Sequence, residues 1–292
     1  MRIYNPKNWF DILFQFHKHD TLRKLSTLII IIALYSGGIA WLELNYLKLS
    51  EKSYLKNFYQ FHNLLGFALS LLLVFRTNTA YDRWWEGRKL WGQLVNNSRN
   101  LAIKLNSLLP DEDKDNKDFF RRTIPLFAAV LRDHLQSETT RYSLDEAEHP
   151  ELKHLDESKH RPNQVARLLN ERAVRLQREG KITGEQLLYI NPELTSFTDI
   201  SGACERIKNT PIPYSYSAFI KKFLFIYVMS LPFGYVLTLE YLVIPVVALV
   251  FYVLASLELI AEEIEDPFGT DSNDLPMLKI AENIKKHVAE IL

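Results

Sequence analysis

The chain has 292 residues with 35 basic and 35 acidic side chains, so its formal net charge at neutral pH is zero. A nucleic-acid-binding protein would carry a basic excess, and we therefore predict no nucleic-acid partner. The single cysteine, Cys204, excludes an internal disulfide framework and a multi-cysteine metal site. The mean hydropathy of −0.11 averages over apolar blocks and a highly charged middle, so it does not indicate a soluble protein.

Four charge-free apolar runs follow one another along the chain. They cover residues 25–42, 58–75, 223–239 and 241–257. Each has about 17 or 18 residues, close to the shortest helix that crosses a hydrocarbon core of roughly 30 Å. One such run could be a buried helix of a soluble protein. Four of them, two separated only by Glu240, predict four membrane-spanning helices.

Basic residues near the ends of these runs predict the orientation of the chain. They are frequent before the first run and after the second, and Lys221 and Lys222 directly precede the third. The connection between the third and fourth runs has none, although the first connection carries Lys48, Lys52 and Lys56. Because basic residues are enriched on the cytoplasmic side, we expect a multi-pass protein of the plasma (inner) membrane with both termini cytoplasmic.

The apolar runs divide the chain into five parts. We predict a cytoplasmic N-terminal segment (1–24), spans one and two (25–75), a helical cytosolic domain (76–222), spans three and four (223–257) and a cytoplasmic C-terminal segment (258–292). Within the middle part, apolar residues recur at helical spacing over 81–109, 119–135, 163–178 and 184–207.

Breaker residues separate these predicted helices. Pro110 follows the first of them, and Gly180 is suited to cap the third. The polar stretch 138–161 is interrupted by Pro150 and predicts an exposed loop or a short helix. Pro211 and Pro213 predict a non-helical entry to the third span, because proline disfavours helix in the residue before it.

Residues that could carry enzyme chemistry are scattered in the sequence. It contains no glycine-rich phosphate loop, no G-x-S-x-G and no H-E-x-x-H motif. His149, His154 and His160 are five and six residues apart, a spacing that does not place them on one helical face, so we interpret them as solvated loop histidines. Cys204 is interpreted as a small buried thiol. We therefore predict that the chain is not an enzyme.

The second apolar run carries a stripe of large side chains. Phe67, Leu71 and Phe75 recur every four residues, which stacks them along one helical face. Within a single chain such a stripe would be packing. In a ring of identical chains it would form three apolar rings around a central axis, and such rings can gate by dewetting. The four runs contain no Asp, Glu, Lys or Arg, and their one histidine is His62, a pattern that argues against a proton-coupled transporter.

The region from Leu65 to Glu86, with the sequence LGFALSLLLVFRTNTAYDRWWE, resembles the signature region of the bestrophin family. Three further stretches agree in order and spacing over nearly the whole chain: KLWG at 89–92, NTPIPY at 209–214 and EDPFGTD at 265–271. The RWW and DPFG motifs are the most specific pieces. The pattern is similar to the prokaryotic branch of the family.

The resemblance implies a fold, an assembly and a function. It implies an all-α membrane protein with four transmembrane helices per subunit and a large helical cytosolic region, assembled as a homopentameric ring that conducts ions. In this family the second span lines a hydrophobic neck, whose three positions fall on Phe67, Leu71 and Phe75. A second constriction near the cytosolic exit would fall at Glu185 or Gln186.

The resemblance also bears on metals. Animal members bind calcium through an acidic cluster after the Pro-Phe-Gly motif, where this chain has Thr270 at the first acidic position. Asp271 and Asp274 remain and could offer oxygen ligands to a hard cation. We therefore do not expect calcium dependence, and we predict no cofactor.

The sequence also bears on the identity of the permeant ion. The prokaryotic branch is associated with monovalent cations such as sodium, and an acidic ring at Glu185 would favour cations. The expected partners are other copies of the chain, membrane lipid and permeant monovalent ions. An anion (chloride) channel of the same family is the first alternative, and a membrane scaffold or receptor without conductance is an alternative of a different class.

Overall fold

The computed structural model describes residues 21–48, 58–136 and 159–292, which are helical and contain no strand. The predicted all-α class is therefore confirmed. The chain groups into two compact units. We call the described residues of 2–82 and 211–265 the apolar unit, and those of 83–210 and 266–292 the charged unit. The five predicted parts, which describe position relative to a membrane, stay predictions.

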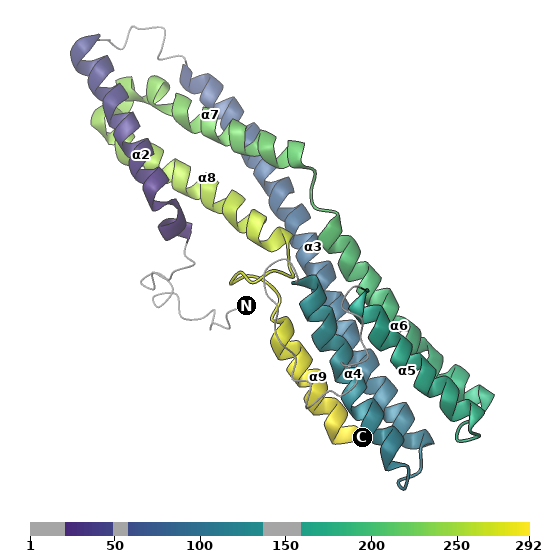
Figure 1. The fold of residues 1–292 in the computed structure, drawn as a ribbon. Coiled ribbons are helices and arrows are strands. Elements are labelled where there is room, and N and C mark those ends of the chain that lie inside the picture. The colour runs from purple at the N-terminus through teal and green to yellow at the C-terminus, as the bar shows by residue number, and fades with distance from the viewer. Residues whose placement is uncertain (1–20, 49–57, 137–158) are drawn as a thin grey trace. The chain divides into compact units, whose positions relative to one another are not determined.

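The apolar unit is built from helices that carry the four apolar runs. They are α2 (Thr21–Trp41) with its π-helical end η1 (Leu42–Tyr46), the first part of α3 (Phe58–Leu108), α7 (Tyr214–Leu239), the 3₁₀ turn η4 (Glu240–Leu242) and α8 (Val243–Glu265) (Figure 1). Helix α8 packs against both α2 and α7. Leu69 and Leu73 of α3 join Val228, Val247 and Phe251 in its core.

Three helical stretches among the described residues are long and apolar enough to cross a membrane. They are Thr21–Tyr46, Gln60–Leu108 and Tyr214–Glu265. The third stretch contains both α7 and α8, and it turns back on itself at Glu240, whose φ of +49° interrupts the helix. This hairpin separates the third and fourth apolar runs, and the count of four spans stays a prediction.

Helix α3 continues well beyond the second apolar run. The sequence predicted a span over 58–75 and a helix over 81–109, and the two are one helix over Phe58–Leu108. The side chains of Thr77 and Thr79 donate to carbonyl oxygens four residues earlier, at 2.8 and 2.9 Å, and so do not compete with the helix backbone. The charge at Arg76 thus ends the apolar run and leaves the helix intact.

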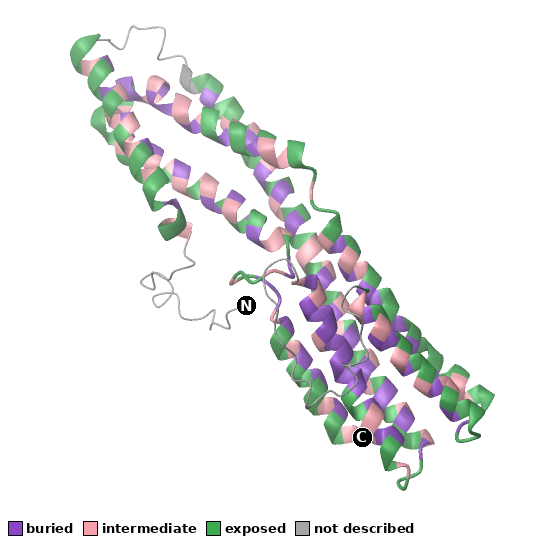
Figure 2. Cartoon of the chain, viewed as in Figure 1, coloured by how far each residue is buried: buried purple, intermediate pink, exposed green. Residues whose placement is uncertain are grey.

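The charged unit packs the rest of α3 with four further helices, α4 (Lys114–Leu135), α5 (Arg161–Arg178), α6 (Gly184–Asn209) and α9 (Met277–Ile291). Helix α4 contacts α5, α6 and α9. Its buried side chains form much of the core (Figure 2), where the rings of Phe127 and Phe197 meet edge to face with centroids 4.8 Å apart. An amphipathic helix is stabilised mainly by such burial.

Several predicted helix ends are confirmed. Helix α3 ends at Leu108, just before Pro110, and Gly180 adopts a φ of +70° after α5 while the amide of Lys181 donates to Leu176 (2.9 Å). The stretch from 210 to 213 is non-helical, as its prolines predicted. Helix α4 begins earlier than predicted, at Lys114, because its first turn is polar and carries no apolar periodicity. Most of the predicted loop at 138–161 lies outside the described residues.

Candidate functional site

The predicted stripe lies on a face of α3 that the described residues leave exposed. Phe67 is 70%, Leu71 46% and Phe75 56% exposed, whereas Leu69 and Leu73 are buried. At 3.6 residues per turn, Leu69 and Leu73 each lie about 160° around the helix from Leu71. The side of α3 that packs within the apolar unit is therefore opposite the stripe, and the stripe is available to lipid or to another copy.

Contacts to α7 hold the packed side of α3 in place. A Cβ at Gly66 would lie 2.6 Å from the hydroxyl of Tyr227, so glycine permits the close approach of the two helices. Nε2 of His62 lies 3.0 Å from the hydroxyl of Ser230 on α7. These contacts fix the rotation of α3 about its axis, and with it the direction in which the stripe points.

A buried guanidinium lies where the apolar run of α3 ends. Arg76 is 1% exposed, and its Nη2 donates to Oε2 of Glu265 at 2.6 Å. Oε1 of Glu265 accepts the amide of Ile212 at 2.7 Å. Nε of Arg76 is 3.5 Å from Oε1 of Glu258, whose two carboxylate oxygens have no hydrogen-bond partner among the described residues. One cation thus lies beside two carboxylates of α8, of which Glu258 is buried and Glu265 is partly buried.

The same end of the apolar unit holds two further ion pairs. Lys24 of α2 pairs with Glu263 of α8, and Lys221 of α7 pairs with Glu262 at 2.8 Å. At the other end of these helices, the side-chain amide of Asn45 in η1 donates to the hydroxyl of Tyr241 in η4 at 2.6 Å. The start of α2, residue 76 of α3, the start of α7 and the end of α8 therefore lie at one end of the unit.

The RWW motif has structural roles inside the charged unit. Arg83 donates to the carbonyl oxygens of Ile207 and Thr210, both at 2.6 Å, and so caps the C-terminus of α6. The indole nitrogen of Trp84 donates to the carbonyl of Asn273 at 3.0 Å.

The DPFG motif packs against the helix that carries RWW. A Cβ at Gly87 would lie 3.2 Å from both the ring of Phe268 and the ring of Pro267, so only glycine fits without displacement. Phe268 is 1% exposed. The DPFG motif therefore packs on α3 at Gly87, two residues beyond the RWW motif, within the charged unit.

The acidic loop after DPFG is folded around Asp274. Its Oδ2 accepts the amide of Asp271 and would lie 2.7 Å from a Cβ at Gly269. Burial, together with the charges of Asp271 and Asp266, raises the pKa of Asp274 to about 7. Asp271 and Asp274 were the weak metal candidates, and in the described residues they belong to no group of three potential ligands.

The two aperture candidates have different environments at the start of α6. Gln186 is engaged in a capping box, because its amide donates to the Thr183 hydroxyl (3.2 Å) and its Oε1 accepts the Thr183 amide (2.8 Å). Glu185 is exposed, and hydrogen bonds from its own backbone amide and from Thr183 lower its pKa. Of the two, Glu185 is the side chain that could offer a charge to a passing ion.

A cluster that the sequence did not predict joins three helices of the charged unit. His160 is not a solvated loop histidine, since it N-caps α5 and its Nε2 lies 2.7 Å from Oε1 of Glu205 on α6. His134 of α4 lies 3.3 Å from the same oxygen. These residues are far apart in sequence, and Pro162 near the start of α5 was the one local signal that His160 stands at a helix start. His149 and His154 lie outside the described residues.

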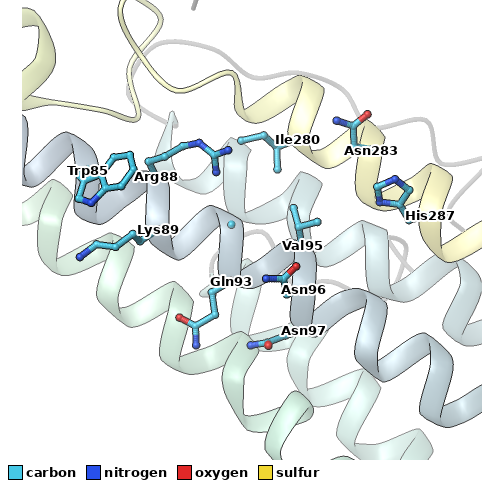
Figure 3. Close-up of a pocket in the computed structure, with 11 residues that line it drawn as sticks. Trp85, Arg88, Lys89, Gln93, Val95, Asn96, Asn97, Ile280, Asn283 and His287 are labelled. Carbon is cyan, nitrogen blue, oxygen red and sulfur yellow. The ribbon is translucent and has the colours of Figure 1, made fainter.

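An open pocket of about 790 Å³ lies between α3 and α9 of the charged unit. Figure 3 shows that Ile280, Asn283 and His287 come from α9, while Arg88 and Lys89 come from α3. None of the described residues that line it carries a carboxylate. The remaining lining residues are Trp85, Gly92, Gln93, Val95, Asn96 and Asn97. This wall of cationic and amide groups was not predicted from the sequence.

Comparison with known proteins agrees over the whole chain. A family model described as bacterial/fungal bestrophin protein matches residues 1–290. The voltage-dependent anion channel-forming protein alr2987 of Nostoc is 33% identical over 98% of this chain and 92% of its own length. The voltage-dependent anion channel-forming protein YneE of Escherichia coli K12 is 30% identical, with the same coverage of both chains.

A solved structure has the same fold. A bacterial bestrophin homolog from Klebsiella pneumoniae, crystallised with a point substitution, superposes with a TM-score of 0.78 at 25% sequence identity. The match covers 92% of this chain and 98% of that one. Together with the family model, this likeness confirms the resemblance recognised in the RWW and DPFG motifs. The chain belongs to the bacterial and fungal bestrophin family.

Proposed function

We propose that this chain is the pore-forming subunit of a homopentameric channel for small monovalent ions, with the first half of α3 around the central axis. Members of this family are ion channels and not enzymes. The observation that carries the neck assignment is the exposure of Phe67, Leu71 and Phe75 directly opposite the packed side of α3. Copies arranged around an axis would turn this stripe into three apolar rings that gate by dewetting.

The neck is tested with purified protein in liposomes. We expect Leu71→Ala to widen the neck and to raise ion flux and single-channel conductance. Leu65→Ala is the matched control, because Leu65 is 39% exposed on α3 and lies about 120° around the helix from Leu71. Flux that Leu71→Ala leaves unchanged would refute the neck. Absence of flux from every variant would favour the scaffold or receptor alternative.

Two hypotheses about the charge of the permeant ion are supported by different observations. The cation reading is supported by Glu185, which is exposed and ionised at the start of α6. The anion reading is supported by relatives named as voltage-dependent anion channel-forming proteins and by a pocket that carries Arg88 and Lys89 without a carboxylate. Reversal potentials measured in asymmetric NaCl distinguish a cation channel from an anion channel. A shift of the reversal potential in Glu185→Gln would support Glu185 as the residue of the cytosolic aperture.

The assembly and the orientation belong to the same proposal. A pentamer is expected from the family, and native mass measurement in mild detergent tests it, because a monomer cannot enclose the stripe. The end of the apolar unit that holds Arg76 would face the cytoplasm of the inner membrane, as its basic flanks suggest. In intact cells, a membrane-impermeant thiol reagent should label Tyr46→Cys and should leave Lys279→Cys unlabelled, and the reverse pattern would overturn this orientation.

A further inference from the structure

The ends of α4 and α6 and the start of α5 bring two imidazoles and one carboxylate together. His134 lies in the last turn of α4, His160 directly precedes α5, and Glu205 lies near the end of α6. The candidate ligand atoms of the three side chains all lie within 4.8 Å of one another. Among the residues that the structure describes, no other three His, Cys, Asp or Glu side chains converge in this way.

We propose that His134, His160 and Glu205 bind a divalent transition-metal ion, with Zn²⁺ as the best fit. Two imidazoles and one carboxylate form a donor set that zinc accepts, with the fourth position left to water. At metal–ligand distances of about 2.0–2.1 Å, tetrahedral ligand atoms lie roughly 3.3 Å apart. The separation of 3.3 Å between Nε2 of His134 and Oε1 of Glu205 already has this value.

The other ligand pair needs a small adjustment. Nε2 of His160 lies 2.7 Å from Oε1 of Glu205, a hydrogen-bond distance that would open by roughly half an ångström around a metal ion. The three side chains are between 26% and 32% exposed, which leaves room for this movement and for the entry of an ion. The hydroxyl of Ser201 donates to the same carboxylate oxygen at 3.0 Å and so helps to orient it.

Metal binding would also change the hydrogen bonding of His160. Its Nδ1 now accepts the amide of Asn163 at 3.2 Å, which places the ring proton on Nε2. A metal at Nε2 moves that proton to Nδ1, so the capping bond of α5 would be exchanged for a metal–nitrogen bond. His160→Asn therefore separates the two roles of this residue, because asparagine is a good N-cap but a poor zinc ligand.

The ion would add three metal–ligand bonds to the packing and polar contacts that already join α4, α5 and α6. His134 and His160 stand at the two ends of the connection between α4 and α5, and Glu205 belongs to α6. A ligand that binds the folded chain and not the unfolded chain stabilises the folded state by mass action. Zinc should therefore raise the unfolding temperature of the charged unit, independently of whether the chain conducts ions.

The test is a titration of the purified, chelator-treated full-length protein with Co²⁺, followed by displacement with Zn²⁺. We expect one site per chain, with the visible ligand-field absorption of tetrahedral Co²⁺, and a higher unfolding temperature with Zn²⁺. His134→Ala, His160→Asn and Glu205→Gln should each weaken binding by at least about 100-fold, because even the hydrogen-bond partners of metal ligands contribute about 10–100-fold. Circular dichroism without metal checks that each variant is folded, and Glu205→Gln keeps the size of the side chain.

Matched controls guard against non-specific binding by other histidines. His287→Ala removes a histidine of the same unit that lies on α9 outside the cluster, and the double variant His149→Ala/His154→Ala removes two that are close in sequence. Both should bind like the parent chain. Binding that survives Glu205→Gln and His160→Asn, or that is lost in either control, would overturn the site, as would a chain that takes up no Co²⁺.

Discussion

The two carboxylates around Arg76 should respond very differently to the same small change. Glu265 receives a charge-assisted hydrogen bond of 2.6 Å from Arg76 and also accepts the amide of Ile212. Glu258 is 4% exposed, lies 3.5 Å from Nε of Arg76, and has no hydrogen bond to either oxygen among the described residues. We predict that Glu265→Gln destabilises the protein and that Glu258→Gln does not.

The magnitudes follow from what each carboxylate loses. Glu265→Gln removes a hydrogen bond to a charged group, which contributes about 1.5–3 kcal/mol. Glu258→Gln removes a charge that is buried away from water. Burying this charge costs free energy, and its 3.5 Å contact with Arg76 is too long to offset that cost. The substitution should therefore leave stability unchanged or raise it by about 1 kcal/mol. At about 2 °C per kcal/mol for a chain of this size, Glu265→Gln should lower the apparent unfolding temperature by about 3–6 °C.

The assay is thermal unfolding in detergent at one fixed scan rate, read by intrinsic fluorescence and by the amount of assembled protein left after heating. Glu262→Gln is the control, because its pair with Lys221 is about half exposed and should contribute less than about 1 kcal/mol. A larger loss for Glu258→Gln than for Glu265→Gln would refute the reasoning. It would mean that Glu258, and not Glu265, is the main partner of Arg76.

Three further predictions concern the charged unit. Burial raises the pKa of Cys204 to about 12, so thiol reagents at pH 8 should label it only after denaturation. In the folded protein, burial raises the pKa of Asp274 to about 7, so the stability of the protein should fall as pH rises from about 4 to 7. Asp274→Asn should remove this pH dependence, which is measured as the unfolding temperature at a series of pH values. Gly87→Ala should destabilise the protein by about 1–3 kcal/mol, because the added methyl group overlaps with Phe268. Gly202→Ala is the control, since Gly202 lies on α6 with open space around it, and this change should stabilise the protein by about 0.5–1 kcal/mol. Denaturant unfolding measures both.

Local signals predicted the helices well because their causes are local. Apolar periodicity located α5 and α6, and Gly180 marked the end of α5 through a backbone conformation that glycine adopts without cost. The start of α4 was missed, since the turn from Lys114 has helical backbone without an apolar face. The four-residue recurrence of Phe67, Leu71 and Phe75 likewise needed only helical geometry.

Features that depend on distant parts of the chain could not be predicted in the same way. Sequence spacing relates each histidine only to residues near it in the chain. The partners of His160 are His134 and Glu205, which only the packing of three helices brings near. The contact of Gly87 with Phe268 is of the same kind. The family resemblance identified the DPFG motif but gave no reason for it, and the structure supplies one as steric complementarity with Gly87.

The charges that end the apolar runs carry information that hydropathy alone does not. A hydropathy profile treats Lys24, Arg76 and Lys221 as three separate boundaries. In the structure each of them pairs with a glutamate in the last turns of α8, so the start of α2, residue 76 of α3, the start of α7 and the end of α8 lie together at one end of the apolar unit. The contact between η1 and η4 places the other ends together in the same way. The membrane orientation that we propose for the apolar unit is therefore a single choice between two sides, and labelling of one position tests it.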